Sequence, residues 1–248
     1  MSKVMIVTGA SRGIGAATAK LAAKKGYAVC VNYANSRAEA EKVVAEIVAG
    51  GGQAVAIQAD VSRDAEVVRL FKEVDEKLGR VDALVNNAGV IGRMCRADEM
   101  DAELLQQVFA ANTFSAFYCT REALKRMSTK HGGKGGAIVM VSSAAARHGG
   151  LPEETHYAAS KGALDSMVAG LGKEVGLEGV RVTGLRPGLI GTEIHNAHGG
   201  QALLDKVGPS VPIGRAGTPE EVAEAILWLA SDAASYVHGT TIDVSGGR

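Results

Sequence analysis

A tyrosine and a lysine stand four residues apart in the chain, at Tyr157 and Lys161. On a helix this spacing puts both side chains on one face. A phenol has a reference pKa of about 10 and is a poor base at neutral pH. An ammonium at ~4 Å would stabilise the phenolate by about 4 kcal/mol at an effective dielectric constant near 20. The pair could therefore move a proton, although a packed tyrosine beside a surface lysine has the same spacing.

A second group of residues has the composition of a phosphate-binding turn. Gly9, Gly13 and Gly15 follow an apolar run and precede a helical pattern. Gly9 permits a tight turn, Gly13 lets a diphosphate approach the backbone, and Gly15 lets the helix approach the sheet. The free N–H groups at the helix N-terminus then favour phosphate. No Gly-Lys-Ser/Thr follows, so a P-loop is disfavoured, but glycines in such a turn could also be only structural.

The charges near the second apolar run indicate which dinucleotide would bind. An NAD site usually has an acidic residue about 20 residues after the glycines, bonded to the ribose 2′-OH. Here the run ends in Asn32-Tyr33, and the first acidic residue of the chain is Glu39. Arg12 and Arg37 could instead face a 2′-phosphate, which a guanidinium binds in bidentate fashion. The sequence predicts NADP over NAD, unless both arginines are only solvated surface charges.

The elements that must position these residues alternate between short apolar runs and helix-period segments. The runs are mostly β-branched and apolar on both faces, as parallel strands covered on both sides must be. They are Val4–Thr8, Ala28–Tyr33, Ala54–Ala59, Ala83–Asn86, Ala137–Val141, Val180–Leu185 and Thr240–Val244. Repeated strand–helix–strand units predict an α/β fold of Rossmann type, with a doubly wound parallel sheet of seven strands, helices on both faces, and one domain over residues 1–248.

Two helix starts and one long loop complete the predicted organisation. Ser36 with Glu39, and Thr218 with Glu221, have the spacing of capping boxes. Pro219 suits the first position of the second of these helices. Residues 189–215 are poor in strand signal, and a loop of that length inside a compact domain is usually functional, for example as a lid.

Composition excludes several classes of protein. The 248 residues include 27 Lys and Arg and 27 Asp and Glu, which argues against a nucleic-acid binder. No apolar stretch approaches ~18 residues, and no signal peptide is recognisable, so no membrane association is expected. Cys30, Cys95 and Cys119 form no disulfide or metal motif, which favours a reduced, cytoplasmic setting. His195 and His198 lack an acidic or cysteine partner nearby, so no metal site is expected.

Taken together, these motifs resemble those of the short-chain dehydrogenase/reductase family, in its compact single-domain form, over nearly the whole chain. The residues that carry the resemblance are Thr8-Gly-Ala-Ser-Arg-Gly-Ile-Gly15, Asp60-Val61, Asn86-Asn87-Ala88-Gly89, Asn112, Ser142-Ser143, Tyr157 with Lys161, and Pro187-Gly188 with Thr192. The resemblance implies an oxidoreductase that transfers a hydride between a nicotinamide and a ketone or secondary alcohol, with Tyr157 as general acid or base.

The resemblance also implies the roles of the other catalytic residues. Lys161 would lower the pKa of Tyr157 and hold the nicotinamide ribose. Ser143 would hydrogen-bond the substrate oxygen, with Ser142 as the competing candidate. Asn112 would hold a water that connects Lys161 to solvent, or would satisfy a local helix irregularity, and both interpretations could hold.

The expected cofactor site combines the glycine turn, the two arginines and the family motifs. Asp60 would bond the adenine amino group, unless it caps the helix that follows, and Ile190 and Thr192 would contact the carboxamide. The cofactor-binding residues predicted are Gly9, Ser11, Arg12, Gly13, Ile14, Gly15, Asn32, Tyr33, Arg37, Asp60, Val61, Asn87, Ala88, Gly89, Tyr157, Lys161, Pro187, Gly188, Ile190 and Thr192.

The substrate is a small carbonyl or alcohol compound that would lie among three segments, 90–98, 147–156 and 193–214. Their cations could favour an acidic or phosphopantetheine-bearing substrate, or they could be solvated rim charges balanced by Glu153 and Glu154. These cations are Arg93, Arg96, Arg147, His148, His156, His195 and His198. The segment between Ser143 and Tyr157 is longer and more acidic than in many relatives, which could reshape the substrate mouth.

Several functions remain open at this point. A 3-oxoacyl-carrier-protein reductase and a sugar or polyol dehydrogenase fit equally well. A dinucleotide-sensing protein without catalysis would not need the proton-transfer residues, and the chain is short for a sugar-nucleotide epimerase. The C-terminal strand and tail, with the long helices around Asn112 and Tyr157, resemble the family's subunit contacts and suggest a homotetramer.

Overall fold

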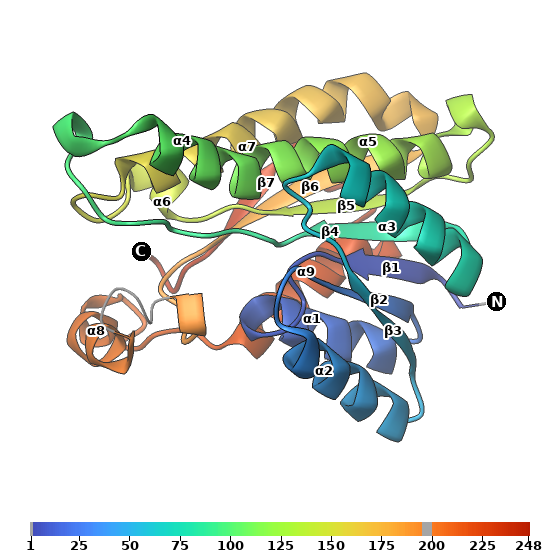
Figure 1. Ribbon diagram of the computed structural model, residues 1–248, viewed down its shortest axis with the longest axis horizontal. Helices are drawn as coiled ribbons and strands as arrows, with labels where there is room; N and C mark the ends of the chain where they lie inside the picture. The colour runs from blue at the N-terminus through green and yellow to red at the C-terminus, as the bar shows by residue number, and fades with distance from the viewer. Residues whose placement is uncertain (1, 195–199) are drawn as a thin grey trace.

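The centre of the protein is a sheet of seven parallel strands, in the order β3-β2-β1-β4-β5-β6-β7 (Figure 1). The structure is a computed structural model that describes residues 2–194 and 200–248. The strands are β1 (Val4–Val7), β2 (Ala28–Tyr33), β3 (Gln53–Gln58), β4 (Val81–Asn86), β5 (Gly136–Val141), β6 (Val180–Pro187) and β7 (Thr241–Val244). All seven predicted runs are confirmed as strands.

Helices cover both faces of the sheet (Figure 1). One face carries α1 (Gly13–Lys24), α2 (Arg37–Ala49) and α9 (Pro219–Ala230), and the other carries α3 (Asp64–Lys77), α5 (Ser115–Met127) and α7 (Thr155–Val175). Two shorter helices precede members of the second group: α4 (Ala102–Phe109) precedes α5, and α6 (Ala145–His148) precedes α7. This arrangement confirms the doubly wound, Rossmann-type α/β fold.

The strands supply two apolar cores, one on each side of the sheet. In β1, Val4 and Ile6 belong to the core with α3, α5 and α7, whereas Met5 and Val7 belong to the core with α1, α2 and α9. This alternation explains why the strands read as apolar throughout. The face that α1 buries consists almost entirely of glycine and alanine with one threonine, so this helix lies close to the sheet.

The expected helix starts have different outcomes. Thr218 and Glu221 form the capping box as predicted: the Glu221 N–H donates to Thr218 Oγ1, and the Thr218 N–H donates to the Glu221 carboxylate. Helix α2 begins after Ser36, as predicted, but the prediction of a capping box there is wrong, because the side chain of Ser36 makes no capping hydrogen bond. Its backbone (φ −88°, ψ 69°) is not in the extended region from which an N-cap side chain normally reaches the helix.

The sequence predicts a loop over residues 189–215, but part of this segment is helical. Residues 200–207 form helix α8 (Gly200–Val207), which lies beyond the carboxyl ends of the strands, apart from the helices that cover the sheet (Figure 1). Leu203 and Val207 stand four residues apart on one face of this helix, a spacing that favours an amphipathic turn. In the described part of the chain, no helix is long and apolar enough to cross a membrane.

Candidate active site

A cleft of ≈ 1080 Å³ opens at the carboxyl ends of the strands. It lies where β1 neighbours both β2 and β4, so that the strand order reverses. Ligands of open α/β sheets bind at this kind of point. The predicted site residues that line it are Gly9, Ser11, Arg12, Gly13, Ile14, Asn32, Tyr33, Asp60, Val61, Asn87, Ala88, Gly89, Ser143, Tyr157, Lys161, Pro187, Gly188, Ile190 and Thr192. Gly15, Arg37 and Asn112 do not line it.

The glycine turn brings the N-terminus of α1 to the wall of the cleft. Gly9 and Gly13 have φ values of 61° and 54°, in the left-handed region that favours glycine. A Cβ on Gly15 would lie 2.5 Å from the Gly9 carbonyl oxygen and 2.6 Å from the amide nitrogen of Asn87. Gly15 thus acts by close packing of α1 rather than by facing the cleft. The first turn of α1 holds no acidic residue, so its free N–H groups suit an anion.

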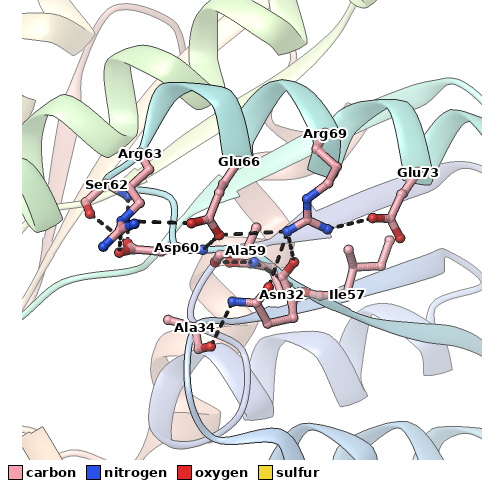
Figure 2. A network of polar contacts seen from close by, with 11 residues as sticks. Asn32, Ala34, Ile57, Ala59, Asp60, Ser62, Arg63, Glu66, Arg69 and Glu73 are labelled. Carbon is pink, nitrogen blue, oxygen red and sulfur yellow. Dashed lines mark hydrogen bonds and ion pairs between the residues drawn. The ribbon is translucent and has the colours of Figure 1, made fainter.

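Asn32 holds the glycine turn in place. Its side chain is buried, and its Oδ1 accepts a hydrogen bond from the Gly9 N–H at 3.3 Å. Its Nδ2 donates to the carbonyls of Ile57 and Ala59 at 3.3 and 3.0 Å (Figure 2). The side-chain amide therefore ties the end of β2 to the turn and to β3, a task that needs both an acceptor and a donor.

The carboxylate of Asp60 closes a local turn at the cleft wall. Its Oδ1 accepts from the Ser62 N–H at 3.0 Å and from the Ser62 hydroxyl at 2.7 Å, and its Oδ2 lies 3.3 Å from Arg63 Nε (Figure 2). Its backbone N–H donates to Glu66 Oε2. Asp60 does not cap α3, because Arg63 is the N-cap residue. Its side chain is 39% exposed, so it can also meet a ligand in the cleft.

The two arginines expected at a 2′-phosphate have different surroundings. Arg12 is exposed, lines the cleft next to α1, and its side chain has no hydrogen bond or ion pair with the described residues. Arg37 lies outside the cleft, where its Nε donates to the Tyr33 hydroxyl at 3.3 Å and lies 3.8 Å from the Glu41 carboxylate. Only Arg12 of the pair faces the cleft.

Tyr157 and Lys161 lie on α7, as the sequence predicts, and both are buried at the cleft wall. Lys161 Nζ donates to the Val141 carbonyl at 2.9 Å and lies 6.0 Å from the centre of the Tyr157 ring. Burial lowers the pKa of Lys161 to about 8. Burial raises the pKa of Tyr157, a hydrogen bond with Ser143 opposes this rise, and the charge of Glu154 adds to it.

The direction of the tyrosine pKa corrects the expectation from the sequence. The resemblance implies that Lys161 lowers the pKa of Tyr157, but in the structure that pKa is raised. The reason is that the phenol is buried while the lysine ammonium is turned to the Val141 carbonyl. The phenol of Tyr157 is therefore protonated at neutral pH.

The two serines after β5 have distinct tasks. Ser142 is buried, and its hydroxyl donates to the Lys161 carbonyl at 3.0 Å, which anchors α7 to the strand. Ser143 is partly exposed. Its hydroxyl hydrogen-bonds that of Tyr157 in the cleft and accepts from the Ala145 N–H. The geometry favours Ser143 as the serine that meets a substrate.

Asn112 lies in a π-helical segment (Ala110–Phe114) between α4 and α5. Its Oδ1 accepts from the Val90 N–H at 2.7 Å, and its Nδ2 donates to the Val90 carbonyl and to Ser160 Oγ. The side chain thus satisfies a local irregularity. A Cβ on Gly89 would lie 3.0 Å from Asn112 Oδ1 and 3.2 Å from Lys161 Nζ, so the missing side chain leaves a space between the two groups.

The cations of the substrate rim are largely neutralised by carboxylates other than those expected. The ion pairs are Arg93–Asp101 at 3.0 Å, Arg96–Asp98 at 3.1 Å and Arg147–Asp243 at 2.8 Å. His148 lines the cleft, and His156 is buried with its Nε2 3.1 Å from the Ile91 carbonyl. His195 and His198 lie outside the described residues. The described residues contain no group of three or more His, Cys, Asp or Glu that could hold a metal.

The sequence predicts that Glu154 is a charge on the rim of the substrate mouth, but the structure buries it. The residue is 6% exposed and lines the cleft beside Tyr157, at the start of α7. The available signal was its position three residues before Tyr157, which places both on one side of the first helical turn.

Comparisons with known proteins give a consistent result. A family model described as enoyl-(acyl carrier protein) reductase matches residues 9–248. The chain is 47% identical over 245 residues to the uncharacterized oxidoreductase YgfF of Escherichia coli, with 99% of each chain covered. It is 40% identical over 247 residues to a 3-oxoacyl-[acyl-carrier-protein] reductase of Synechocystis, covering 99% of this chain and 96% of the relative. It is also 37% identical over 256 residues to a versicolorin reductase of Emericella nidulans, covering 99% of this chain and 95% of the relative.

Proposed function

Because the chain belongs to the short-chain dehydrogenase/reductase family, we propose that it is an NADP-dependent oxidoreductase that interconverts a ketone and a secondary alcohol. The observation that carries the proposal is the meeting of Ser143, Tyr157 and Lys161 on the wall of the cleft that also receives the N-terminus of α1. A proton-transfer group and an anion site thus share one crevice. A protein that only senses a dinucleotide would not need the first of these.

The residues present fit an NADP molecule. Gly9 and Gly13 present no side chain to a diphosphate, the first turn of α1 has no carboxylate, and Arg12 is available to a 2′-phosphate. A Glu193 carboxylate oxygen lies 3.7 Å from the Cβ position of Gly13 and would oppose the phosphates. Lys161 would hold the nicotinamide ribose, and the segment from Pro187 to Thr192 would face the nicotinamide. When bound, the cofactor would supply or accept a hydride.

Tyr157 would act as the general acid in ketone reduction. Its raised pKa keeps the hydroxyl protonated, so it can donate this proton to the carbonyl oxygen of the substrate. The Ser143 hydroxyl would donate to the same oxygen and stabilise the charge that develops there. Lys161, with a pKa of about 8, would exchange protons across the space beside Gly89, where a water could bridge it to Asn112 Oδ1.

The substitution Tyr157→Phe tests this mechanism. It should lower turnover by about 10²–10⁴-fold, because the proton donor is removed, while NADP binding is retained. Tyr236→Phe is the matched control, since Tyr236 is fully exposed. Reduction of a ketone panel is followed through nicotinamide absorbance. Full activity of the Tyr157→Phe variant would show that the mechanism is wrong.

The choice of NADP depends on Arg12. Removing a charge-assisted hydrogen bond costs about 1.5–3 kcal/mol, so Arg12→Ala should weaken NADP binding by about 10- to 100-fold and leave NAD binding nearly unchanged. Arg37→Ala should have a smaller effect, since Arg37 lies outside the cleft. Fluorescence titration of both nucleotides gives the dissociation constants, and tighter binding of NAD by the unaltered protein would refute the preference.

The substrate class is open between two kinds of compound. The Synechocystis relative favours a 3-oxoacyl thioester carried on acyl carrier protein. The buried carboxylate of Glu154 in the cleft favours a hydroxylated compound of the sugar or polyol kind.

The expected homotetramer is supported by apolar side chains on the outer face of one helix. Phe114 and Phe117, at the start of α5, are 44% and 51% exposed. We expect this face to be covered by a second copy of the chain, and light scattering that finds a monomer at micromolar concentration would contradict it. The cytoplasmic location stays a prediction.

A further inference from the structure

Resting on the proposed function, we infer that Glu154 determines substrate specificity by accepting a hydrogen bond from a donor on the carbon next to the reacting carbonyl. The substrates are then hydroxy ketones and the corresponding vicinal diols, or their amino counterparts, rather than ketones that lack a neighbouring donor.

Glu154 and Tyr157 approach the cleft from the same turn. Glu154 is the N-cap residue of α7, and Tyr157 is the third residue of the helix. Side chains three residues apart lie about 5–6 Å from one another on a helix surface. Both residues line the cleft, and the charge of Glu154 acts on the Tyr157 phenol. A group bonded to Glu154 would therefore lie close to the carbon whose oxygen meets Tyr157.

The carboxylate of Glu154 retains capacity to accept hydrogen bonds. Its Oε2 accepts from the Leu151 N–H at 3.0 Å, and this is its only hydrogen bond within the part of the chain that the structure describes. Its Oε1 accepts no hydrogen bond from those residues, and it is not fully enclosed by protein atoms. An ionised carboxylate has about four lone-pair sites, so this side chain offers acceptors on the cleft side.

The backbone before Glu154 is shaped to hold the carboxylate in this place. Glu153 has φ 71°, and no other described residue except glycine has a positive φ. Its carbonyl accepts from the Cys95 N–H at 3.1 Å, which ties the segment to the loop that contains Cys95. A Cβ on Gly150 would lie 3.3 Å from Glu154 Oε2, so this glycine leaves room for the carboxylate. Strained residues of this kind persist where the surrounding structure fixes them, often at ligand sites.

The charges around the mouth of the cleft favour an uncharged or cationic substrate that carries a hydrogen-bond donor. Arg93, Arg96 and Arg147 are each paired with an aspartate. The charge that acts on the pKa of Tyr157 is the negative one of Glu154, and Lys161 Nζ lies 6.0 Å from the centre of the Tyr157 ring. A buried carboxylate beside the reacting centre attracts a hydroxyl or an ammonium and repels an anion.

The test compares three alcohols that share one carbon skeleton: butan-2-ol, butane-2,3-diol and 3-aminobutan-2-ol. Their oxidation with NADP is measured for the wild-type protein, for Glu154→Gln, and for Glu153→Gln. The amide of Glu154→Gln can still accept from the Leu151 N–H, so this variant should fold. Glu153→Gln removes the same charge from an exposed neighbour and serves as the matched control.

The wild-type protein should favour the diol or the amino alcohol over butan-2-ol by about tenfold or more in kcat/KM, as expected for a hydrogen bond to a charged group. The diol and amino alcohol arms show whether the donor is a hydroxyl or an ammonium. Glu154→Gln should lose most of this preference, and the pH at which oxidation sets in should fall, because the charge that raises the pKa of Tyr157 is gone. Glu153→Gln should keep the wild-type preference.

Equal use of all three alcohols by the wild-type protein, with turnover that requires Tyr157, would overturn the inference and leave the proposed function intact. The same conclusion follows if Glu154→Gln keeps the wild-type preference. No turnover of the three alcohols by a protein that reduces members of the ketone panel would overturn the inference and leave the proposed function intact. No turnover of the three alcohols and of the whole ketone panel, with the cofactor at saturation, would overturn the proposed function itself, and the inference with it. If Glu154→Gln does not fold, Glu154→Asp replaces it: the charge remains but is withdrawn by one methylene, and the preference should fall.

Discussion

Replacing Lys161 with methionine should stabilise the folded protein at neutral pH while it removes activity. The lysine is 4% exposed, and its pKa falls from 10.5 to about 8 because burial disfavours the charged form. The two values differ by about 2.5, and at 1.36 kcal/mol for each pKa unit the charged lysine costs the folded state about 3 kcal/mol at pH 7. Loss of the charge-assisted hydrogen bond to the Val141 carbonyl offsets about 1.5 kcal/mol or more. The expected gain in the free energy of unfolding is therefore at most about 2 kcal/mol.

The sign of the pH dependence follows from proton binding. Between about pH 8 and 10.5 the unfolded chain keeps the Lys161 proton that the folded protein has lost. Stability therefore rises with pH in this window through this group. The advantage of Lys161→Met should be complete below pH 8 and should disappear as the pH approaches 10.5. Taking the difference between the two proteins removes the contribution of the other groups that titrate here.

The assay is urea unfolding followed by circular dichroism, at pH 7, 8, 9 and 10, for the wild-type protein and for Lys161→Met. Lys173→Met is the control, because Lys173 is an exposed lysine on the same helix. It should leave both the stability and its pH dependence nearly unchanged. The reasoning is refuted if Lys161→Met is the less stable protein at pH 7, or if the difference does not shrink as the pH rises.

Three further predictions concern other parts of the structure. Asn32→Asp should lower the free energy of unfolding by about 2–4 kcal/mol in a urea titration, because two buried carbonyls lose their donor; Asn35→Asp, at an exposed site, should not. Glu193→Gln should tighten NADP binding about twofold to fivefold at low salt, and less at high salt, because a Glu193 oxygen lies 3.7 Å from the Cβ position of Gly13; unchanged affinity would contradict this. The three cysteines are buried, so a chromogenic disulfide reagent should find no reactive thiol at pH 8 before urea is added and three afterwards.

Much of the fold could be predicted because the sequence carries it locally. Each strand is a short apolar run, and the glycine turn and the Thr218 capping box lie within a few residues. The prediction failed where the outcome depends on backbone angles, which residue spacing alone does not fix. Ser36 has the right spacing for a cap, but its backbone angles do not direct its hydroxyl to the helix.

The candidate site shows the same limit in its electrostatics. The spacing of Tyr157 and Lys161 correctly predicts a shared helix, but not that burial governs both pKa values. Glu154, predicted as a charge on the rim, lines the cleft, and Arg37, predicted to bind the cofactor, lies outside it. Burial depends on how loops from several strands pack together, and no local pattern records it.

The alanine face of α1 makes tolerance to change uneven across the molecule. A larger residue on that face would lift the helix from the sheet and tilt its first turn, so the damage would reach the phosphate end of the cleft even from a site far along the helix. The opposite core, with its methionines, leucines and phenylalanine, can exchange volume among neighbours. Random mutagenesis should therefore yield few tolerated substitutions on the buried face of α1 and many in the core on the opposite side of the sheet.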